Sequence, residues 1–303
     1  MTVTPEQATE AANAAFGSHP GHRALHAKGT LLKGTFTATA EAARLTRAAH
    51  MQGDPVSATV RVSNGSGNPR SPDYTSDVRG LAVKMYLPDG SRTDIVAQTA
   101  PRFPFHGPEG FVELLKAQGS GAAVALKLPL VLARHREAIP SLPANMAALR
   151  PPQSYASCTY YAVHAYRFVD GDGGSRYVRY TLHPEQPAPR LTPWQAKRLG
   201  RDYLQKEIRE RVATGPVRFT LELQVAGPDD NVDDPTSVWP GDRQRVNAGT
   251  FEITGLETER ETGDDVLVFD PTRVADGIEL SGDPVLRFRP KAYSDSVARR
   301  TKS

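Results

Sequence analysis

Apolar and polar residues alternate along eight short runs of this chain, and such alternation is typical of β-strands that bury one face. The runs cover residues 30–39, 56–63, 80–87, 93–97, 160–169, 176–182, 217–225 and 249–256. Clusters of Asp, Gly, Asn and Pro separate them and favour turns. Because helical patterns do not alternate regularly with these runs, we predict an α+β fold built on an antiparallel sheet or barrel.

Helical periodicity is restricted to a few segments. We predict helices at residues 5–16, 40–50, 109–117 and 193–213. In the longest of these, apolar side chains recur at helical spacing and Gly215 follows as a stop signal. The most apolar stretch, residues 122–133, is about a dozen residues long, whereas a bilayer span takes roughly 20. We therefore expect core or groove lining there, and no membrane span.

Composition describes an ordinary globular protein, with 39% hydrophobic and 23% charged residues among 303. The net charge of +3 is small and the basic residues are scattered, which argues against a nucleic-acid partner. Cys158 is the only cysteine, so the chain forms no internal disulfide. The first residues lack the basic and apolar regions of a secretory signal, so we expect a cytoplasmic location.

Two metal patterns are incomplete. His22 and His26 have the spacing of a helical zinc pair, but Arg23 stands where the zinc-protease pattern needs Glu. The run that begins at Asp170 resembles a calcium loop, but Thr181 occupies its twelfth position, where an acidic ligand is needed. A hairpin turn explains this run better.

Two short runs at opposite ends of the chain make chemical sense together. Arg289 precedes Tyr293 by four residues, and its positive charge would favour the ionised phenol oxygen. Such an oxygen is a known protein ligand of haem iron. His26, near the start, could then serve as the acid and base on the other haem face.

The segments around these residues resemble the haem catalase family, specifically its shortened members, the catalase-related peroxidases. From about residue 15 to the C-terminus the similar segments follow the family order. They are Arg-Ala-Leu-His-Ala-Lys-Gly at 23–29, Val-Arg-Val-Ser at 60–63, Asp-Val-Arg-Gly-Leu-Ala-Val-Lys at 77–84, Tyr-Ala-Val-His at 161–164, Asp-Pro-Thr-Ser-Val-Trp-Pro at 234–240, Phe-Asp-Pro-Thr at 269–272 and Arg-Pro-Lys-Ala-Tyr at 289–293.

The resemblance implies a catalase-like antiparallel β-barrel with flanking helices. Residues 1–303 would form a single haem-binding domain, with an N-terminal arm of about residues 1–15. The C-terminal helical domain of large catalases would be absent. The implied cofactor is haem b, iron protoporphyrin IX.

The resemblance also implies a role for each site residue. Tyr293 would bind the iron, and His26 would move the peroxide proton while Ser63 sets the tautomer of its imidazole. The haem propionates would be held by Arg23, Arg61 and Arg300. A hydrogen-bonded network behind the iron would consist of Arg289, His164 and Asp283. An apolar approach channel would be lined by Leu25, Phe103 and Phe111.

One segment departs from the family pattern. Full-length catalases carry Asp-Leu-Val-Gly-Asn-Asn-Thr-Pro where this chain has residues 94–101, and Thr99 is the residue that we match to the catalytic Asn, with Gln98 adjacent. A hydroxyl places its donor differently from an amide. We therefore predict a peroxidase that reduces hydrogen peroxide or organic hydroperoxides with small organic electron donors and has weak or no catalase activity. We expect a homodimer.

Two other functions remain open. Some catalase-like proteins isomerise fatty-acid hydroperoxides to allene oxides without a reductant, and the apolar residues 122–133 could line a channel for such substrates. A haem carrier without turnover is a further alternative. His26 beside Ser63 argues against it, because a carrier needs no acid and base.

Overall fold

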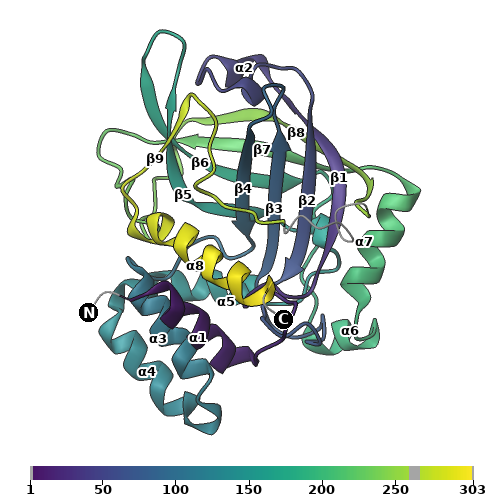
Figure 1. The fold of residues 1–303 in the computed structure, drawn as a ribbon, viewed down its shortest axis with the longest axis vertical. Coiled ribbons are helices and arrows are strands. Elements are labelled where there is room, and N and C mark those ends of the chain that lie inside the picture. The colour runs from purple at the N-terminus through teal and green to yellow at the C-terminus, as the bar shows by residue number, and fades with distance from the viewer. Residues whose placement is uncertain (1–2, 259–266, 302–303) are drawn as a thin grey trace.

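The computed structural model describes residues 3–258 and 267–301, with the backbone alone at 300 and 301. Eight antiparallel strands curl into a barrel at its centre (Figure 1). They are β1 (Gly29–Ala38), β2 (Val56–Asn64), β3 (Arg79–Tyr86), β4 (Arg92–Gln98), β5 (Tyr160–Val169), β6 (Ser175–Pro184), β7 (Val217–Val225) and β8 (Arg245–Leu256). All eight strands predicted from the alternating pattern are confirmed.

The strands are hydrogen-bonded in the order β4-β3-β2-β1-β8-β7-β6-β5. The pair Gln98 and Tyr161 joins β4 to β5 and closes the ring. A ninth strand, β9 (Ile278–Leu280), pairs with the edge of β5 opposite β6, farther along the strand than the pair with β4. Closure leaves these eight strands without a free edge, which is how barrels avoid exposed backbone groups.

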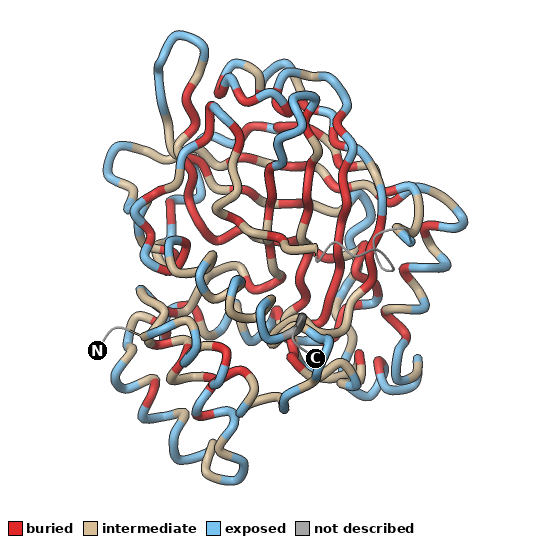
Figure 2. The backbone as a smooth tube through the Cα atoms, in the orientation of Figure 1, coloured by how far each residue is buried: buried red, intermediate tan, exposed pale blue. Residues whose placement is uncertain are grey.

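The barrel interior is filled by one face of every strand. Residues paired directly across neighbouring strands share a face, and Leu32, Val60, Val83 and Ile95 form one such buried row. Figure 2 shows the strands largely buried along their length. The alternate residues point outward, and this outer face of β1 to β4 carries part of the candidate site.

A layer of helices lies beneath the barrel (Figure 1). It contains α1 (Pro5–Phe16), α3 (Pro108–Gln118), α4 (Val124–Arg134) and α5 (Leu142–Ala148). The first of these begins with a capping box, in which the Thr4 side chain accepts from the Gln7 backbone and the Gln7 side chain accepts from Thr4. The long helix α8 (Pro284–Thr301) runs between this layer and the barrel.

Two helical predictions need correction, and the helix α8 was not predicted. Residues 40–50 form only α2 (Ala40–Ala43) and a 3-10 turn at Ala49–Met51. The helix predicted at 193–213 is two helices, α6 (Pro193–Arg198) and α7 (Tyr203–Thr214). Gly200 lies between them with φ of 103°, which a right-handed helix cannot contain. The helix α8 was not predicted, because its apolar residues are not segregated on one side and Pro290 lies inside it.

No helix in the described ranges combines the length and the apolar character needed to cross a bilayer. The apolar segment 122–133 largely coincides with α4, a short surface helix that is only partly buried. The expectation that this segment is core or groove lining is therefore correct for only one of its faces.

Candidate active site

The helix α8 places Arg289 and Tyr293 one turn apart on the same side. The Nε and Nη2 groups of Arg289 both donate to the Tyr293 hydroxyl oxygen, at 2.8 and 2.5 Å. Two charged donors directed at one oxygen stabilise negative charge on it. Burial alone would lower the pKa of Arg289, but the nearby Tyr293 oxygen outweighs it and the pKa is raised. The guanidinium therefore stays charged.

A buried histidine and a carboxylate extend this contact into the barrel wall. His164 lies on β5, and its Nε2 is 2.9 Å from the Nη1 of Arg289. Its Nδ1 is 2.6 Å from a carboxylate oxygen of Asp283. Both His164 and Asp283 are 1% exposed. The four residues form one continuous chain from Asp283 through His164 and Arg289 to Tyr293.

The direction of the protons in this chain follows from the donors present. Arg289 can only donate, so the Nε2 of His164 must accept and its Nδ1 must carry the hydrogen that Asp283 accepts. Burial lowers the pKa of His164 and favours this neutral form, although the hydrogen bond to Asp283 acts in the opposite direction. His164 is therefore held as a single tautomer.

Asp283 also begins α8. Its second carboxylate oxygen accepts from the backbone nitrogens of Val285 at 2.8 Å and Leu286 at 3.2 Å. This is the usual way in which an Asp caps a helix N-terminus. One side chain thus orients His164 and fixes the start of the helix that carries Tyr293.

His26 lies in the loop between α1 and β1, with φ of 54°. It is the one non-glycine residue with positive φ in the described ranges, and such strain often marks a functional site. Its backbone nitrogen donates to Gly65 at 2.9 Å, and its Nδ1 is 3.0 Å from the Ser63 hydroxyl. No hydrogen bond joins its Nε2 to another residue within 3–258 or 267–301.

His26 is neutral over the ordinary pH range. Burial is the main cause that lowers its pKa to about 3, and the positive charges of Arg61, Arg289 and Arg23 contribute to the same shift in that order. The contribution of Arg289 shows that the two halves of the site lie within electrostatic reach of each other. His26 is nevertheless partly accessible, so its ring borders open space.

A glycine on β3 makes room for this imidazole. A Cβ at Gly80 would lie 2.8 Å from both the Nδ1 of His26 and the hydroxyl of Ser63. Real Cβ atoms do not approach so closely, so an alanine would have to displace one of these groups. The outward face of Gly80 is therefore the surface on which His26 rests.

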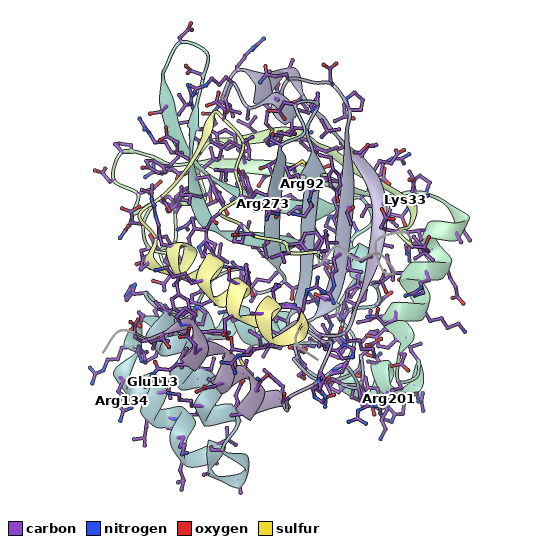
Figure 3. All side chains as sticks on the ribbon, in the orientation of Figure 1. Lys33, Arg92, Glu113, Arg134, Arg201 and Arg273 are labelled. Atoms are coloured by element: carbon purple, nitrogen blue, oxygen red, sulfur yellow. The ribbon has the colours of Figure 1, made fainter. Side chains whose placement is uncertain are left out.

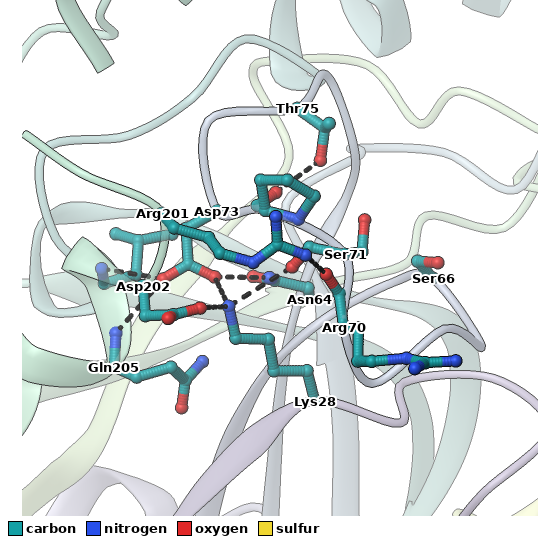
Figure 4. A network of polar contacts seen from close by, with 12 residues as sticks. Lys28, Asn64, Ser66, Arg70, Ser71, Asp73, Thr75, Arg201, Asp202 and Gln205 are labelled. Atoms are coloured by element: carbon teal, nitrogen blue, oxygen red, sulfur yellow. Dashed lines mark hydrogen bonds and ion pairs between the residues drawn. The ribbon is translucent and has the colours of Figure 1, made fainter. Parts of the chain in front are cut away.

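A network of polar contacts anchors the segment just after His26 (Figure 4). The ammonium group of Lys28 contacts the carboxylates of Asp73 at 2.7 Å and Asp202 at 2.6 Å. The amide of Asn64 donates to the same oxygen of Asp73 at 2.8 Å. Asp73 is completely buried, and a buried carboxylate is stable only when it is paired in this way. The network holds the His26 loop against β2.

The arginines predicted to hold propionates are placed near His26. Arg23 donates to the backbone oxygen of Leu267 at 2.7 Å, and Arg61 to that of Ala27 at 3.2 Å. Together with Arg289, they make the space beside His26 positive, and after burial their charges are the next largest causes that lower the pKa of His26. This positive potential fits a cofactor with two carboxylates. The Tyr293 oxygen, which accepts two hydrogen bonds from Arg289, fits the iron of such a cofactor. The side chain of Arg300 lies outside the described residues.

Apolar side chains gather between α1 and α3. The rings of Phe103 and Phe111 are 5.6 Å apart at a tilt of 46°. Phe111 also packs with Leu25 against the small core that joins α1 to α3. The three residues predicted to line an approach to the iron thus belong to one contiguous apolar region.

Thr99 is placed differently from the expectation. It is 2% exposed, and its hydroxyl accepts from the backbone nitrogen of Arg79 at 3.0 Å. Gln98 pairs directly with Gly80 and therefore shares the face on which His26 rests, while the alternation of strand residues turns Thr99 to the other face. Gln98, expected only as the neighbour of Thr99, is the residue of this pair that shares the face of Gly80. The strand pattern at 93–97, continued by one residue, was the signal that could have found it.

The sequence is similar to proteins of one known family. Residues 18–303 match the family model for catalase. A catalase-related peroxidase of Mycolicibacterium paratuberculosis is 49% identical over 99% of this chain and 95% of its own length. A catalase-related peroxidase of Synechococcus elongatus is 33% identical over 99% of this chain and 89% of its own length.

The solved structures that resemble this fold are larger. A fungal catalase superposes with a TM-score of 0.84 at 24% identity, over 94% of this chain but 61% of its own. Catalase A from Saccharomyces cerevisiae superposes with a TM-score of 0.82 at 23% identity, over 93% of this chain and 62% of its own. These two likenesses concern the fold alone, whereas the family model and the closely similar full-length relatives concern the sequence. The chain belongs to the catalase family of oxidoreductases.

Proposed function

We propose that this protein is a haem b peroxidase that reduces hydrogen peroxide or organic hydroperoxides with small organic electron donors, and that its catalase activity is weak. The observation that carries this proposal is the chain from Asp283 to Tyr293, together with a neutral His26 within reach of Arg289. A bound haem would supply the redox-active iron at which the peroxide is reduced.

The proposed role of Tyr293 is to hold the iron through its hydroxyl oxygen. The two hydrogen bonds from Arg289 favour the ionised oxygen, which is the form that binds a ferric ion. The proposed role of Arg23, Arg61 and Arg300 is to bind the propionates, because a planar guanidinium matches the two oxygens of a carboxylate. His164 and Asp283 keep Arg289 in the orientation that Tyr293 needs.

The proposed role of His26 is to move one proton. A neutral imidazole can accept the proton of a hydroperoxide and return it to the departing oxygen. The pKa of about 3 keeps the ring neutral at any ordinary working pH. Ser63 holds Nδ1, so Nε2 is the nitrogen left to exchange the proton.

The proposal of weak catalase activity now rests on Gln98. Its side chain shares the face of Gly80, where an Asn stands in the full-length family segment. Gln is one methylene longer than Asn, so its amide group would lie at a different position relative to His26. We infer that guiding a second peroxide is impaired while oxidation of an external donor is retained.

Spectroscopy and turnover of the haem-loaded protein test this function. The wild type should show a Soret band and oxidise a guaiacol-type donor faster than it evolves oxygen. Tyr293→Phe should lose haem on gel filtration and shift the ferric spectrum, whereas the matched change Tyr177→Phe on β6 should do neither. An unchanged Soret band in purified Tyr293→Phe would contradict the ligand assignment. Oxygen evolution that exceeds donor oxidation would contradict the peroxidase assignment.

The same preparation separates the two alternative functions. The apolar side chains of Leu25, Phe103 and Phe111 would also suit a fatty-acid hydroperoxide. Conversion of a lipid hydroperoxide to an isomer without a donor would therefore favour an isomerase. Fully loaded protein that turns over neither peroxide nor lipid hydroperoxide would favour a carrier.

A further inference from the structure

The helix α4 is apolar on all sides except the one that carries Lys127 and Arg134. Its sequence is Val-Ala-Leu-Lys-Leu-Pro-Leu-Val-Leu-Ala-Arg, with Lys127 and Arg134 as the two charged residues. One face packs inward, where Val131 is 5% exposed and belongs to a small core with Phe105. The opposite face is open, with Leu126 at 76% and Leu130 at 59% exposure.

The open face is a continuous stripe. Leu126, Pro129, Leu130 and Ala133 are all exposed and follow the spacing i, i+3, i+4 and i+7, which places them on one side of a helix. Figure 1 shows α4 at the outer edge of the helix layer, on the side of α3 away from the barrel. Two opposite apolar faces are typical of a helix that is covered by protein or lipid on both, and this chain covers only the face that carries Val131.

The charges around the stripe that lack an ion-pair partner among the described residues are positive. Residues 114–136 contain no Asp or Glu, but they contain four exposed cations: Lys116, Lys127, Arg134 and Arg136. Arg134 forms an ion pair with Glu113 at 3.2 Å (Figure 3), and His135 contacts Glu113 and Glu137. For Lys116, Lys127 and Arg136, no ion pair occurs with any residue in the described ranges.

These positive charges indicate which partner would cover the apolar stripe. A second copy of this chain, packed about a two-fold axis, would bring the same cations together with no acidic residue of the segment to oppose them. An anionic lipid surface would complement them, and its acyl region would accept the leucines. We propose that α4 docks this protein on membranes that contain anionic phospholipid, with Leu126 and Leu130 inserted at the headgroup boundary.

Vesicle sedimentation of the full-length, haem-loaded protein tests this docking without reference to its reaction. The protein should pellet with vesicles of phosphatidylcholine and phosphatidylglycerol, and salt should release it because exposed charges are screened. Leu126→Asp with Leu130→Asp should abolish binding. The matched control Leu199→Asp, at a leucine 56% exposed between α6 and α7, should leave binding intact.

A second variant guards against misfolding of the first. Lys127→Gln with Arg136→Gln leaves all apolar contacts in place, and each lost cation should weaken binding to the anionic vesicles about fivefold. The proposal is overturned if the wild type stays in the supernatant. It is overturned equally if pure phosphatidylcholine vesicles bind the protein as well, or if light scattering shows a dimer that the leucine variant splits into monomers.

Discussion

His164 and Arg289 lie 125 residues apart in the chain, and a 2.9 Å hydrogen bond between them decides which nitrogen of the imidazole carries hydrogen. The guanidinium can only donate, so the histidine can only accept there. The hydrogen on the other nitrogen then points to Asp283. The orientation of Arg289 toward Tyr293 therefore depends on a carboxylate that touches neither of them.

Replacing Asp283 by Asn should break this arrangement while keeping the residue size. Asn has one acceptor oxygen, which can either cap α8 or face His164, so one contact is lost. A buried hydrogen bond left unmade costs about 1–3 kcal/mol. We expect that loss in chemical denaturation and weaker haem retention in a titration. Asp276→Asn, at an exposed carboxylate, should change stability much less than Asp283→Asn and leave haem retention unchanged. Equal haem affinity in the two variants would refute the dependence on Asp283.

Gly80→Ala should displace His26. The new Cβ would lie 2.8 Å from the imidazole and from the Ser63 hydroxyl, and overpacking of this kind costs about 1–3 kcal/mol. We expect the reaction with peroxide to slow in stopped-flow measurements while haem binding through Tyr293 is retained. Gly241→Ala, which meets no atom within 4 Å, is the control. A wild-type peroxide rate in Gly80→Ala would show that His26 does not depend on this space.

Gln98→Asn should raise oxygen evolution relative to donor oxidation, because it shortens the amide on the face where His26 rests. Thr99→Asn should not. The Thr99 hydroxyl is buried and bonded to the backbone of Arg79, so a larger amide there should lower the free energy of unfolding without changing the ratio of the two activities. An oxygen electrode and a donor assay on the same samples measure that ratio. If Thr99→Asn raised the ratio of oxygen evolution to donor oxidation and Gln98→Asn did not, Thr99 rather than Gln98 would be the residue that limits catalase activity.

His50 should make the protein sensitive to acid. It is 1% exposed beside Phe36, its Nδ1 has no hydrogen-bond partner among the residues that the structure describes, and burial lowers its pKa to about 4. In the unfolded chain this histidine has an ordinary pKa near 6.5. Between about pH 4 and pH 6.5 the unfolded chain therefore binds a proton that the folded protein does not bind. Stability is therefore fully present above about pH 6.5 and falls by about 3 kcal/mol in total as the pH drops to about 4.

Denaturation at pH 7 and at pH 4.5 measures this loss. His50→Met should flatten the pH dependence, because methionine fills the site without a titrating group. Met51→Leu changes the neighbouring buried packing and should keep the wild-type slope. If the free energy of unfolding fell equally with pH in the wild type and both variants, groups other than His50 would cause the acid sensitivity.

Much of the fold was predictable because its signals are local. Alternation along a strand reflects burial of one face, and all eight barrel strands were found from it. The helix at Pro5–Phe16 was found because its cap and its apolar spacing lie within the helix itself. The fused prediction at 193–213 was wrong, because apolar spacing continues across Gly200 while its backbone conformation does not. The helix that carries Tyr293 was missed because its apolar residues are not segregated on one side and Pro290 lies inside it.

The sequence by itself determined the barrel strands, the spacing of Arg289 and Tyr293, and the family resemblance that pointed to His26 and Ser63. The tertiary structure alone decided which proton His164 carries, why His26 is neutral, that Gln98 and not Thr99 shares the face of Gly80, and that one apolar face of α4 is open. The physical reason is the same in each case. A strand pattern records whether a residue is buried, but a proton position or a pKa depends on which distant groups surround it.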